Sequence, residues 1–394
     1  MKKNKPVILL EGKYGPGNLG DDILMIVSSK VLLECCRDCE IVIELSKPEI
    51  VKNWLSGVTL LNHFELKKAP VLKVLGGGGQ FYSFPLSWNI EKTKKGLGVR
   101  KLVHGRKVLS ALKNRLGKIR KHWLTKSVDT AIFCVGVGPF VENSPQQEEA
   151  RNMLMKSSYV SVRDSNSFAI CKAWGIRNVK QFTDPAFLYE FWRDANIPAN
   201  EIKFSNIERS IAFIPRYWPH DEIGQSYLKP MLKVAKKLNT QNIKSIFYFF
   251  SKYYDREIIE FVDNQGFNVK VWDPETNQKP ARFVEQIAEQ NMLVVSARAH
   301  GVILPAIFGI PGIAVEIEPK LVNVHRMLPR GTKLWQKPFN PDSLLKMIQE
   351  MLENNDEFRR LVNEDVSYNH NIALEAKADI QRFIRDYLKK QHHV

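Results

Sequence analysis

Short apolar runs alternate with helix-like segments along most of the chain, and this alternation limits the fold more than any other feature. In the first half, apolar runs lie at Val7–Glu11, Glu40–Leu45, Val71–Leu75, Ala131–Gly136 and Tyr159–Arg163, with helical patterns over Asp21–Glu34 and Ser165–Ala173. The second half repeats the rhythm from Ser210–Pro215 to Ile313–Ile317. Strands that alternate with helices form parallel sheets covered by helices on both faces. The sequence therefore predicts an α/β protein.

The segment Tyr189–Arg209 separates the two halves and is polar and weakly periodic, so we interpret it as a linker. A chain of 394 residues is also too long for one ordinary core. We predict two doubly wound Rossmann-like domains that face each other across a cleft, as in glycosyltransferase-B folds. The expected N-terminal domain covers residues 1–190, the C-terminal domain 210–375, and a C-terminal helix and tail 376–394. Ligands of such sheets bind at the carboxyl ends of the strands.

The apolar runs are all shorter than the roughly 18–20 residues that span a bilayer, and the first one is too short for a signal peptide. The five cysteines lack a second Cys/His cluster at zinc spacing, so we expect reduced thiols and no metal site. These features favour a cytoplasmic enzyme.

Residues 92–126 carry most of the net charge of +16, because they contain 13 Lys or Arg and no Asp or Glu. Five apolar residues in this insert recur at helical spacing: Leu109, Leu112, Leu116, Ile119 and Trp123. A basic amphipathic helix of this kind is typical of segments that lie on an anionic membrane surface. The alternative is that the apolar stripe packs on the protein's own core. Nucleic acid is not expected as a partner, since no stacking or reader motif accompanies the charge.

The first loop, residues 15–20, fits the G-x-G-x-x-G pattern of dinucleotide-binding folds, and Glu44 ends the next strand-like run. Asp21 and Asp22, however, occupy the first helical turn, where they complement the positive end of the helix dipole and repel a pyrophosphate. A sugar hydroxyl can instead donate a hydrogen bond to Asn18 or Asp21. We expect these two residues to contact an acceptor, with a purely capping role as the alternative.

Residues 76–79 are four successive glycines that follow an apolar run. Without side chains, their backbone amides can approach a ligand closely. We therefore expect a loop in which Gly77, Gly78 and Gln80 contact the acceptor.

Two arginines follow apolar runs at predicted strand ends. Arg163 can direct its planar fork at a carboxylate or phosphate, or form a structural ion pair with Asp164 or Asp184. Arg298 lies two residues before His300, where a buried strand gives way to a helix, and this pairing favours a functional site.

Seven motifs in order resemble those of the polysaccharide pyruvyl transferase family, over about residues 11–350. They are Gly17–Asp21, Gly76–Gly79, Gly136–Pro139, Val162–Asp164, Asp184–Phe187, Arg298–His300 and Lys320. The resemblance implies a glycosyltransferase-B-like fold and phosphoenolpyruvate as the donor. The basic insert 92–126 is not part of this family pattern.

The resemblance also implies roles for individual residues. His300 is expected to be the acid that protonates phosphoenolpyruvate, while Arg163 and Arg298 hold the donor. Lys320 matches a family lysine tied to activity, and Arg216 is a further candidate for neutralising the donor. Asp21 can orient or deprotonate the acceptor hydroxyl. This chemistry requires neither a metal nor a redox cofactor.

The implied product is a pyruvate ketal on a sugar of a polysaccharide precursor, which we expect to be lipid-linked and held at the inner face of the membrane. A nucleotide-sugar glycosyltransferase is an alternative, with Glu316 or Glu318 as the ribose-binding carboxylate. A nicotinamide-dependent oxidoreductase explains the first loop and Glu44 but leaves Arg298 and His300 without a role. A membrane scaffold without enzymatic activity explains only residues 92–126.

Overall fold

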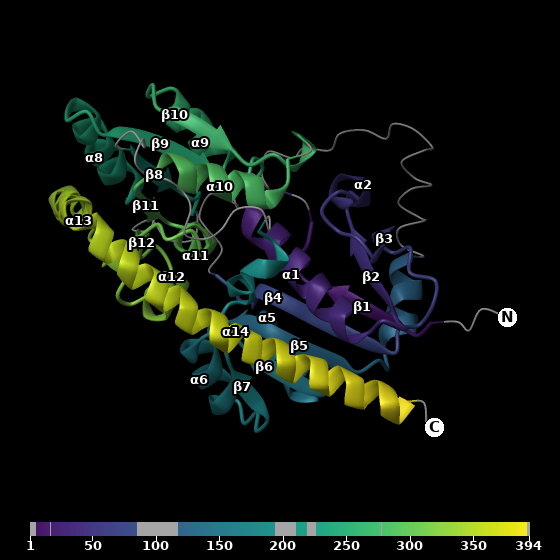
Figure 1. Ribbon diagram of the computed structural model, residues 1–394. Helices are drawn as coiled ribbons and strands as arrows, with labels where there is room; N and C mark the ends of the chain where they lie inside the picture. Colours follow the sequence, from purple (N-terminus) through teal and green to yellow (C-terminus); the bar gives the residue numbers. More distant parts are fainter. Residues whose placement is uncertain are drawn as a thin grey trace.

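The chain forms two α/β domains, each built on one parallel sheet (Figure 1). The computed structural model describes residues 5–15, 17–84, 117–193, 210–218, 226–276 and 278–391. Most of the expected linker and most of the basic insert lie outside these residues. The fold class expected from the sequence is confirmed.

The N-terminal sheet has seven strands in the order β3-β2-β1-β4-β5-β6-β7, all paired in parallel. Its strands are β1 (Val7–Glu11), β2 (Glu40–Leu45), β3 (Thr59–Asn62), β4 (Leu72–Phe81), β5 (Thr130–Val137), β6 (Tyr159–Val162) and β7 (Val179–Gln181). The helices are α1 (Leu19–Cys35), α2 (Pro48–Val51), α5 (Pro145–Lys156) and α6 (Ser165–Ala173), followed by the short 3₁₀ helices η1 (Pro185–Phe187) and η2 (Tyr189–Phe191). The central strand β1 is apolar and buried on both faces, as expected for a parallel sheet between helical layers.

The C-terminal sheet has six parallel strands in the order β10-β9-β8-β11-β12-β13. Its strands are β8 (Ser210–Ile214), β9 (Lys244–Phe249), β10 (Asn268–Val271), β11 (Leu293–Ser296), β12 (Gly312–Val315) and β13 (Thr332–Trp335). Its helices are α8 (Leu228–Thr240), α9 (Arg256–Asp263), α10 (Pro280–Gln290), α11 (Ala299–Ala306), α12 (Pro319–Met327) and α13 (Pro341–Glu353), with the 3₁₀ helix η4 (Pro274–Thr276). In each domain the strand order reverses beside the first strand, at β1/β4 and at β8/β11. Ligands of doubly wound sheets bind at such switch points.

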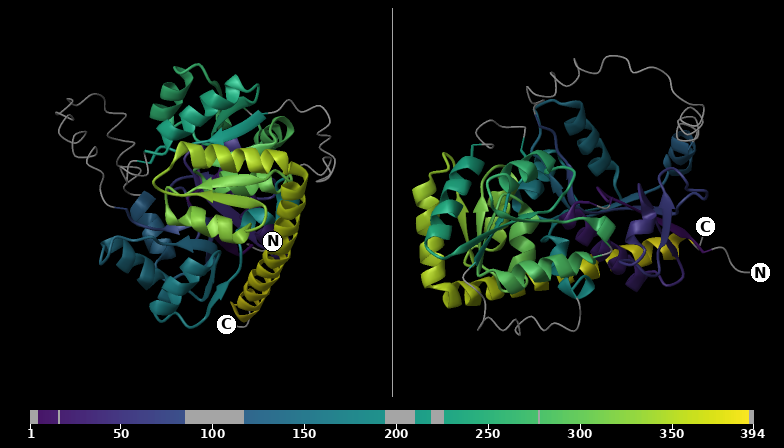
Figure 2. Two further views of the ribbon diagram at one scale, coloured as in Figure 1. Left: turned by 90° about the vertical axis from the view of Figure 1, so that its left-hand side faces the viewer. Right: turned by 90° about the horizontal axis from the view of Figure 1, so that it is seen from above.

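The last helix, α14 (Asn355–Gln391), runs along both domains (Figures 1 and 2). The Asn369 side chain links them, because its oxygen accepts a hydrogen bond from Thr183 and its nitrogen donates to the Met327 carbonyl. Farther along, the Gln381 amide donates to the Val31 carbonyl in α1. The expected boundary between residues 375 and 376 thus falls inside one continuous helix.

The glycine run differs from the expected loop, because residues 76–79 continue β4 as a strand paired with β5. A Cβ on Gly76 would lie 2.3 Å from the Tyr14 hydroxyl oxygen and 2.6 Å from the Ser28 hydroxyl oxygen. The missing side chain therefore makes room for buried neighbours in α1 and the loop before it.

The described end of the basic insert is helical over residues 117–125. Ile119 is 48% exposed and Trp123 is 72% exposed, so these two members of the apolar stripe do not pack on the core. Leu124 packs there instead, against a cluster that includes Val7 and Leu9. The other three members, Leu109, Leu112 and Leu116, lie outside the described residues. No helix in the described part of the chain is both long and apolar enough to cross a membrane.

Candidate active site

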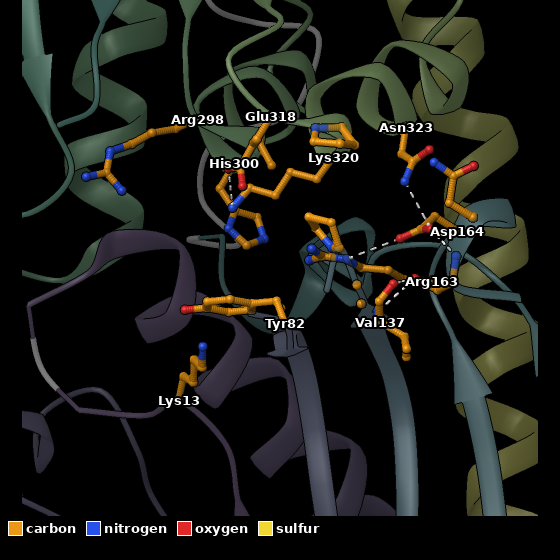
Figure 3. A pocket seen from close by; sticks show the side chains of 18 of the residues that line it. Lys13, Tyr82, Val137, Arg163, Asp164, Arg298, His300, Glu318, Lys320 and Asn323 are labelled. Carbon is orange, nitrogen blue, oxygen red and sulfur yellow. Dashed lines mark hydrogen bonds and ion pairs between the residues drawn. The ribbon is translucent and has the colours of Figure 1, made fainter. Parts of the chain in front are cut away.

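A pocket of about 390 Å³ lies between the domains, where the two switch points face each other (Figure 3). The N-terminal domain contributes residues that follow β1, β4, β5 and β6, and the C-terminal domain contributes residues that follow β8, β11 and β12. Seven residues expected from the sequence line it: Asn18, Asp21, Arg163, Arg216, Arg298, His300 and Lys320. Residues separated by up to 300 positions thus meet because strand ends of both sheets converge.

His300 is the second residue of α11, and its ring packs on the N-terminus of α1 in the other domain. A Cβ on Gly20 would lie only 2.1 Å from Nδ1 of His300, so only glycine fits beneath the ring. On its other side, Nε2 of His300 lies 3.5 Å from a carboxylate oxygen of Asp184. The imidazole is thereby positioned by two groups of the N-terminal domain.

Asp184 is buried and joins His300 to Arg163, whose Nη1 donates to the same carboxylate at 2.8 Å. Burial alone raises the pKa of Asp184, but the charges of His300 and Arg163 outweigh it and hold that pKa well below its ordinary value. Asp184 is therefore an anion in the folded protein. The ion pair that the sequence left as an alternative for Arg163 is present, and the residue lines the pocket as well.

Space for the Arg163 guanidinium is provided by a glycine on the neighbouring strand. A Cβ on Gly136 would lie 3.0 Å from Nη2 of Arg163. Asp164, the next residue, caps α6 by accepting a hydrogen bond from the Ser167 amide. Arg163 can thus pair with Asp184 through Nη1 and still offer nitrogens to a bound anion.

Arg298 is held in the same manner in the C-terminal domain. Its Nη2 pairs with Asp255, a fully buried carboxylate that also accepts the backbone amide of Tyr217. The Nε of Arg298 has no hydrogen-bond partner in the described residues, although it is buried. An unsatisfied buried donor is costly, and a bound anion can satisfy it.

Arg216, Glu318 and Lys320 form a third charged group on the wall opposite Arg163. The Glu318 carboxylate accepts a hydrogen bond from Nη1 of Arg216, and it lies 2.7 Å from Nζ of Lys320. Burial and the nearby positive charge of Arg216 together lower the pKa of Lys320 to about 8, against the opposing effect of Glu318. Lys320 is therefore a cation that can release its proton near neutral pH.

The first loop does not form a dinucleotide site. The backbone amide of Leu19, at the start of α1, donates to the Phe250 carbonyl of the other domain. The Glu44 carboxylate accepts a hydrogen bond from the Leu66 backbone amide and forms an ion pair with Lys121. It is therefore engaged by groups of the protein itself. Asn18 donates to Asp21 at 2.6 Å, and both residues line the pocket.

Three expected acceptor residues lie away from this pocket. A Cβ on Gly77 would contact Leu24 and Pro185, and Gly78 also faces Leu24, so both glycines serve packing on α1. Gln80 donates to the carbonyls of residues 76 and 77 on its own strand. Only Gly79 of the glycine run lines the pocket.

The sequence reasoning missed Lys13 and Tyr82, which face each other at the pocket's entrance (Figure 3). The Nζ of Lys13 lies 3.4 Å from the centroid of the Tyr82 ring. Burial lowers the pKa of Lys13 to about 8. The place of Lys13 two residues after β1 was a usable signal, because loops after central strands bind ligands. The sequence suggests Asp184 as a partner of Arg163, but its contact with His300 and the pairing of Asp255 with Arg298 carried no such signal.

The charges in this pocket favour a small anion. Five basic residues line it against three acidic ones, and the basic residues come from both domains: Lys13, Arg163, Arg216, Arg298 and Lys320 against Asp21, Asp164 and Glu318. The histidine lies among them, and histidine side chains serve as acids and bases in catalysis. No group of His, Cys, Asp and Glu suited to a metal ion is found among the described residues.

Solved structures define the class to which this architecture belongs. UDP-GlcNAc 2-epimerase from Neisseria meningitidis, bound to UDP-GlcNAc, has a TM-score of 0.58 at 12% identity, over 96% of this chain and 100% of that chain. MnaA of S. aureus with UDP has a TM-score of 0.60 at 11% identity, over 98% and 97%. At such identities the likeness shows the fold alone, which is the glycosyltransferase-B arrangement of two parallel-sheet domains.

The family is shown by the sequence itself. The model of the polysaccharide pyruvyl transferase family matches residues 18–319, which is most of the chain. The chain therefore belongs to the polysaccharide pyruvyl transferase family, and the resemblance drawn from the seven motifs is confirmed. A search of proteins with curated functions found no significant match.

Proposed function

We propose that this protein transfers the enolpyruvyl carbons of phosphoenolpyruvate to a sugar and closes them into a pyruvate ketal. The observation that carries the proposal is the convergence of His300 with five basic side chains in one small interdomain pocket. Phosphoenolpyruvate bears its carboxylate and its phosphate on the same carbon, C2, so it needs several cations around a compact volume. A proton donor must also reach its methylene carbon, and His300 lies among the cations.

The donor is held by charge-assisted hydrogen bonds in this proposal. Arg163 and Arg298 are each anchored by one buried carboxylate, Asp184 and Asp255, which keeps the forks in place before the donor arrives. Lys320 completes the cation set from the C-terminal domain. Because the arginines are preorganised, less side-chain entropy is lost on binding.

The reaction balances without a further reactant. The imidazolium of His300 protonates the methylene carbon, which leaves an oxocarbenium centre at C2 of the donor. One sugar hydroxyl adds at C2 and loses its proton to a base such as Asp21. Inorganic phosphate then leaves with the C2–O bonding pair, and a second hydroxyl of the same sugar adds at C2 to close the ketal. Of the two protons released by the hydroxyls, one returns to His300 and the other leaves with the phosphate as hydrogen phosphate. The preorganised cations stabilise the phosphate as charge develops on it.

The test uses donor binding before turnover. Isothermal titration with phosphoenolpyruvate should show one site, and binding should be lost in Arg298→Ala. UDP-GlcNAc serves as the competing ligand, because structures with this fold bind it. Binding of UDP-GlcNAc in preference to phosphoenolpyruvate would refute the proposal. Release of phosphate from phosphoenolpyruvate, on addition of lipid-linked oligosaccharides extracted from membranes, then tests the transfer.

The structure weakens the nucleotide-sugar alternative at its proposed ribose carboxylates. Glu318 is buried and engaged by both Arg216 and Lys320. Glu316 accepts a hydrogen bond from Gln336 at 2.8 Å on the surface, and does not line the pocket. Glu318 is thus committed to two cations, and Glu316 lies outside the pocket.

We further propose that the enzyme acts on a lipid-linked acceptor at the inner face of the membrane. The support is the exposure of Ile119 and Trp123 on a helix that also exposes Lys118, Arg120 and Lys126. Apolar rings and basic side chains on one short helix suit the boundary of an anionic bilayer, where each basic residue contributes about 1 kcal/mol.

Liposome co-sedimentation tests this membrane contact. Vesicles of anionic lipid should retain the protein at low salt, and vesicles of neutral lipid should not. Low salt is needed because the electrostatic attraction is screened within about 8 Å at physiological ionic strength. Trp123→Ala together with Lys118→Gln should weaken the binding. Tyr368→Ala is the matched control, because Tyr368 is an exposed aromatic residue on α14 (65% exposed). Binding that ignores lipid charge would contradict the proposal.

A further inference from the structure

A groove of about 1190 Å³ opens from the pocket toward the surface between the domains. The two cavities share lining residues at their junction, among them Lys13, Asn18, Asp21, Tyr82 and Arg298. The groove is about three times as large as the pocket, so it is far larger than phosphoenolpyruvate requires. Its continuity with the pocket makes it the path by which an acceptor reaches the donor.

The outer wall of the groove is aromatic. Tyr253 is 57% exposed and Tyr254 is 71% exposed, in the turn between β9 and α9, and Tyr217 follows β8. Adjacent exposed aromatic side chains in a groove offer flat apolar faces with a hydroxyl at the rim. Sugar rings have apolar C–H faces and hydroxyl edges, and they fit such surfaces.

The aromatic turn is tied to the donor site. Asp255, the last residue of the turn, accepts the Tyr217 backbone amide and pairs with Arg298. The Tyr254 amide donates to the Ser251 hydroxyl, which closes the turn. The wall is therefore held by the same buried carboxylate that positions one of the donor arginines.

Charge distinguishes the outer groove from the pocket. Lys47 and Arg256 line the outer part together with Glu257 and Glu275, and Lys47 pairs with Glu275 across the two domains. Two basic and two acidic side chains cancel, whereas the pocket has an excess of basic ones. A balanced set of donors and acceptors suits a hydroxyl-rich neutral ligand better than a second anion.

We propose that the outer groove binds the sugar units next to the one that receives the ketal, with a sugar ring stacked on Tyr254. The acceptor is then an oligosaccharide of at least two rings, and a free monosaccharide is a poor substrate. This inference rests on the proposed transfer for its biological role, but the sugar site itself can be tested without turnover.

A glycan microarray that carries mono- to hexasaccharides provides that test. The protein should bind a set of oligosaccharides and bind their terminal monosaccharides less. Tyr254→Ala should weaken the oligosaccharide signal roughly five- to tenfold, as expected for the loss of one aromatic face. Tyr253→Ala provides a second variant, and Tyr368→Ala is again the exposed-tyrosine control. Titration with phosphoenolpyruvate should give the same affinity in all three variants.

Each outcome separates the two proposals. Equal binding of mono- and oligosaccharides, no binding to any glycan, or an unchanged signal in Tyr254→Ala overturns the groove proposal, even when phosphoenolpyruvate binds. The protein could also bind oligosaccharides through Tyr254 and fail to bind phosphoenolpyruvate. That result would support the sugar site in the groove and refute phosphoenolpyruvate as the donor.

Discussion

Gly20 offers the sharpest test of how the site is built, because a single methyl group at this position acts on His300 from the other domain. Gly20 is the second residue of α1 and lies directly beneath the imidazole ring. In Gly20→Ala the new Cβ would lie 2.1 Å from Nδ1, 2.6 Å from Cγ and 3.0 Å from Cβ of His300. Rotation of the imidazole ring cannot relieve these contacts, since the Cγ and Cβ atoms that attach the ring are also close.

The expected magnitude follows from this overlap. Carbon and nitrogen atoms in van der Waals contact are separated by roughly 3.5 Å, so the ring must retreat by more than about 1 Å. The position of Nε2 relative to Asp184, now 3.5 Å away, changes with the ring. A displacement of about 1 Å at a reacting group costs on the order of 10²-fold in rate. The helix itself gains from the change, since alanine is about 1 kcal/mol more favourable than glycine in a helix.

The assay is a double-mutant cycle on kcat/KM for phosphate release, with Gly20→Ala, His300→Ala and the double variant. If Gly20 acts through His300, the alanine at position 20 should cost about 10²-fold in the wild-type background and far less beside His300→Ala, where the ring is gone and only the 3.0 Å contact with Cβ of residue 300 remains. Thermal melts of all three variants check that the fold is retained. Full activity in Gly20→Ala, or losses that add in the double variant, would refute the reasoning.

Three other predictions concern single sites. His300→Gln should lower turnover by roughly 10²–10⁴-fold in a protein with an unchanged melting curve, because the general acid is lost; near-normal turnover would remove His300 from that role. Arg163→Lys and Arg298→Lys keep the charge but lose the planar fork, so the KM for phosphoenolpyruvate should rise in each, and an unchanged KM in both would indicate purely structural arginines. Burial raises the pKa of Asp22 well above its ordinary value of 3.8, despite hydrogen bonds from Trp272 and Gly17. The folded protein thus favours the neutral form of the Asp22 carboxyl. The contribution of this form to the free energy of unfolding is full at acid pH and is lost as pH rises toward the raised pKa. The Tm of wild type should accordingly fall relative to that of Asp22→Asn as pH increases above 3.8, and a difference independent of pH would contradict this.

The fold could be predicted from the sequence because parallel strands buried on both faces are continuous apolar runs. The short strands β3, β7 and β13 were not predicted. The glycine run at residues 76–79 was a further exception, since four glycines carry no apolar signal and favour a loop by composition. Their strand conformation depends on Tyr14 and Ser28, which fill the volume next to Gly76. Packing of that kind is not visible in local sequence.

The candidate site was predicted in part for the same reason. Arg163, Arg298 and His300 follow strands, and the carboxyl ends of strands converge in any doubly wound sheet. Asp184 was one of two carboxylates that the sequence suggested for Arg163, but its contact with His300 and the pairing of Asp255 with Arg298 could not be assigned, because they depend on how loops distant in sequence meet in three dimensions. The role of Gly20 could not be foreseen either, since it depends on the relative placement of the two domains.

The site therefore exists only while the domains keep one relative position. His300 belongs to the C-terminal domain, yet Gly20 and Asp184 of the N-terminal domain position its ring. The links that hold this arrangement include the Leu19 amide on the Phe250 carbonyl at 3.0 Å, the Trp272 indole on Asp22 at 2.8 Å, and Asn369 of α14 between Thr183 and Met327. Because Leu19 and Asp22 lie within four residues of Asn18, the start of α1, which places Asn18 and Asp21 in the pocket, also joins the domains. A movement that widened the cleft would separate Asn18 and Asp21 from Arg298 and His300, so the pocket residues of the two domains are brought together by the same contacts that hold the fold.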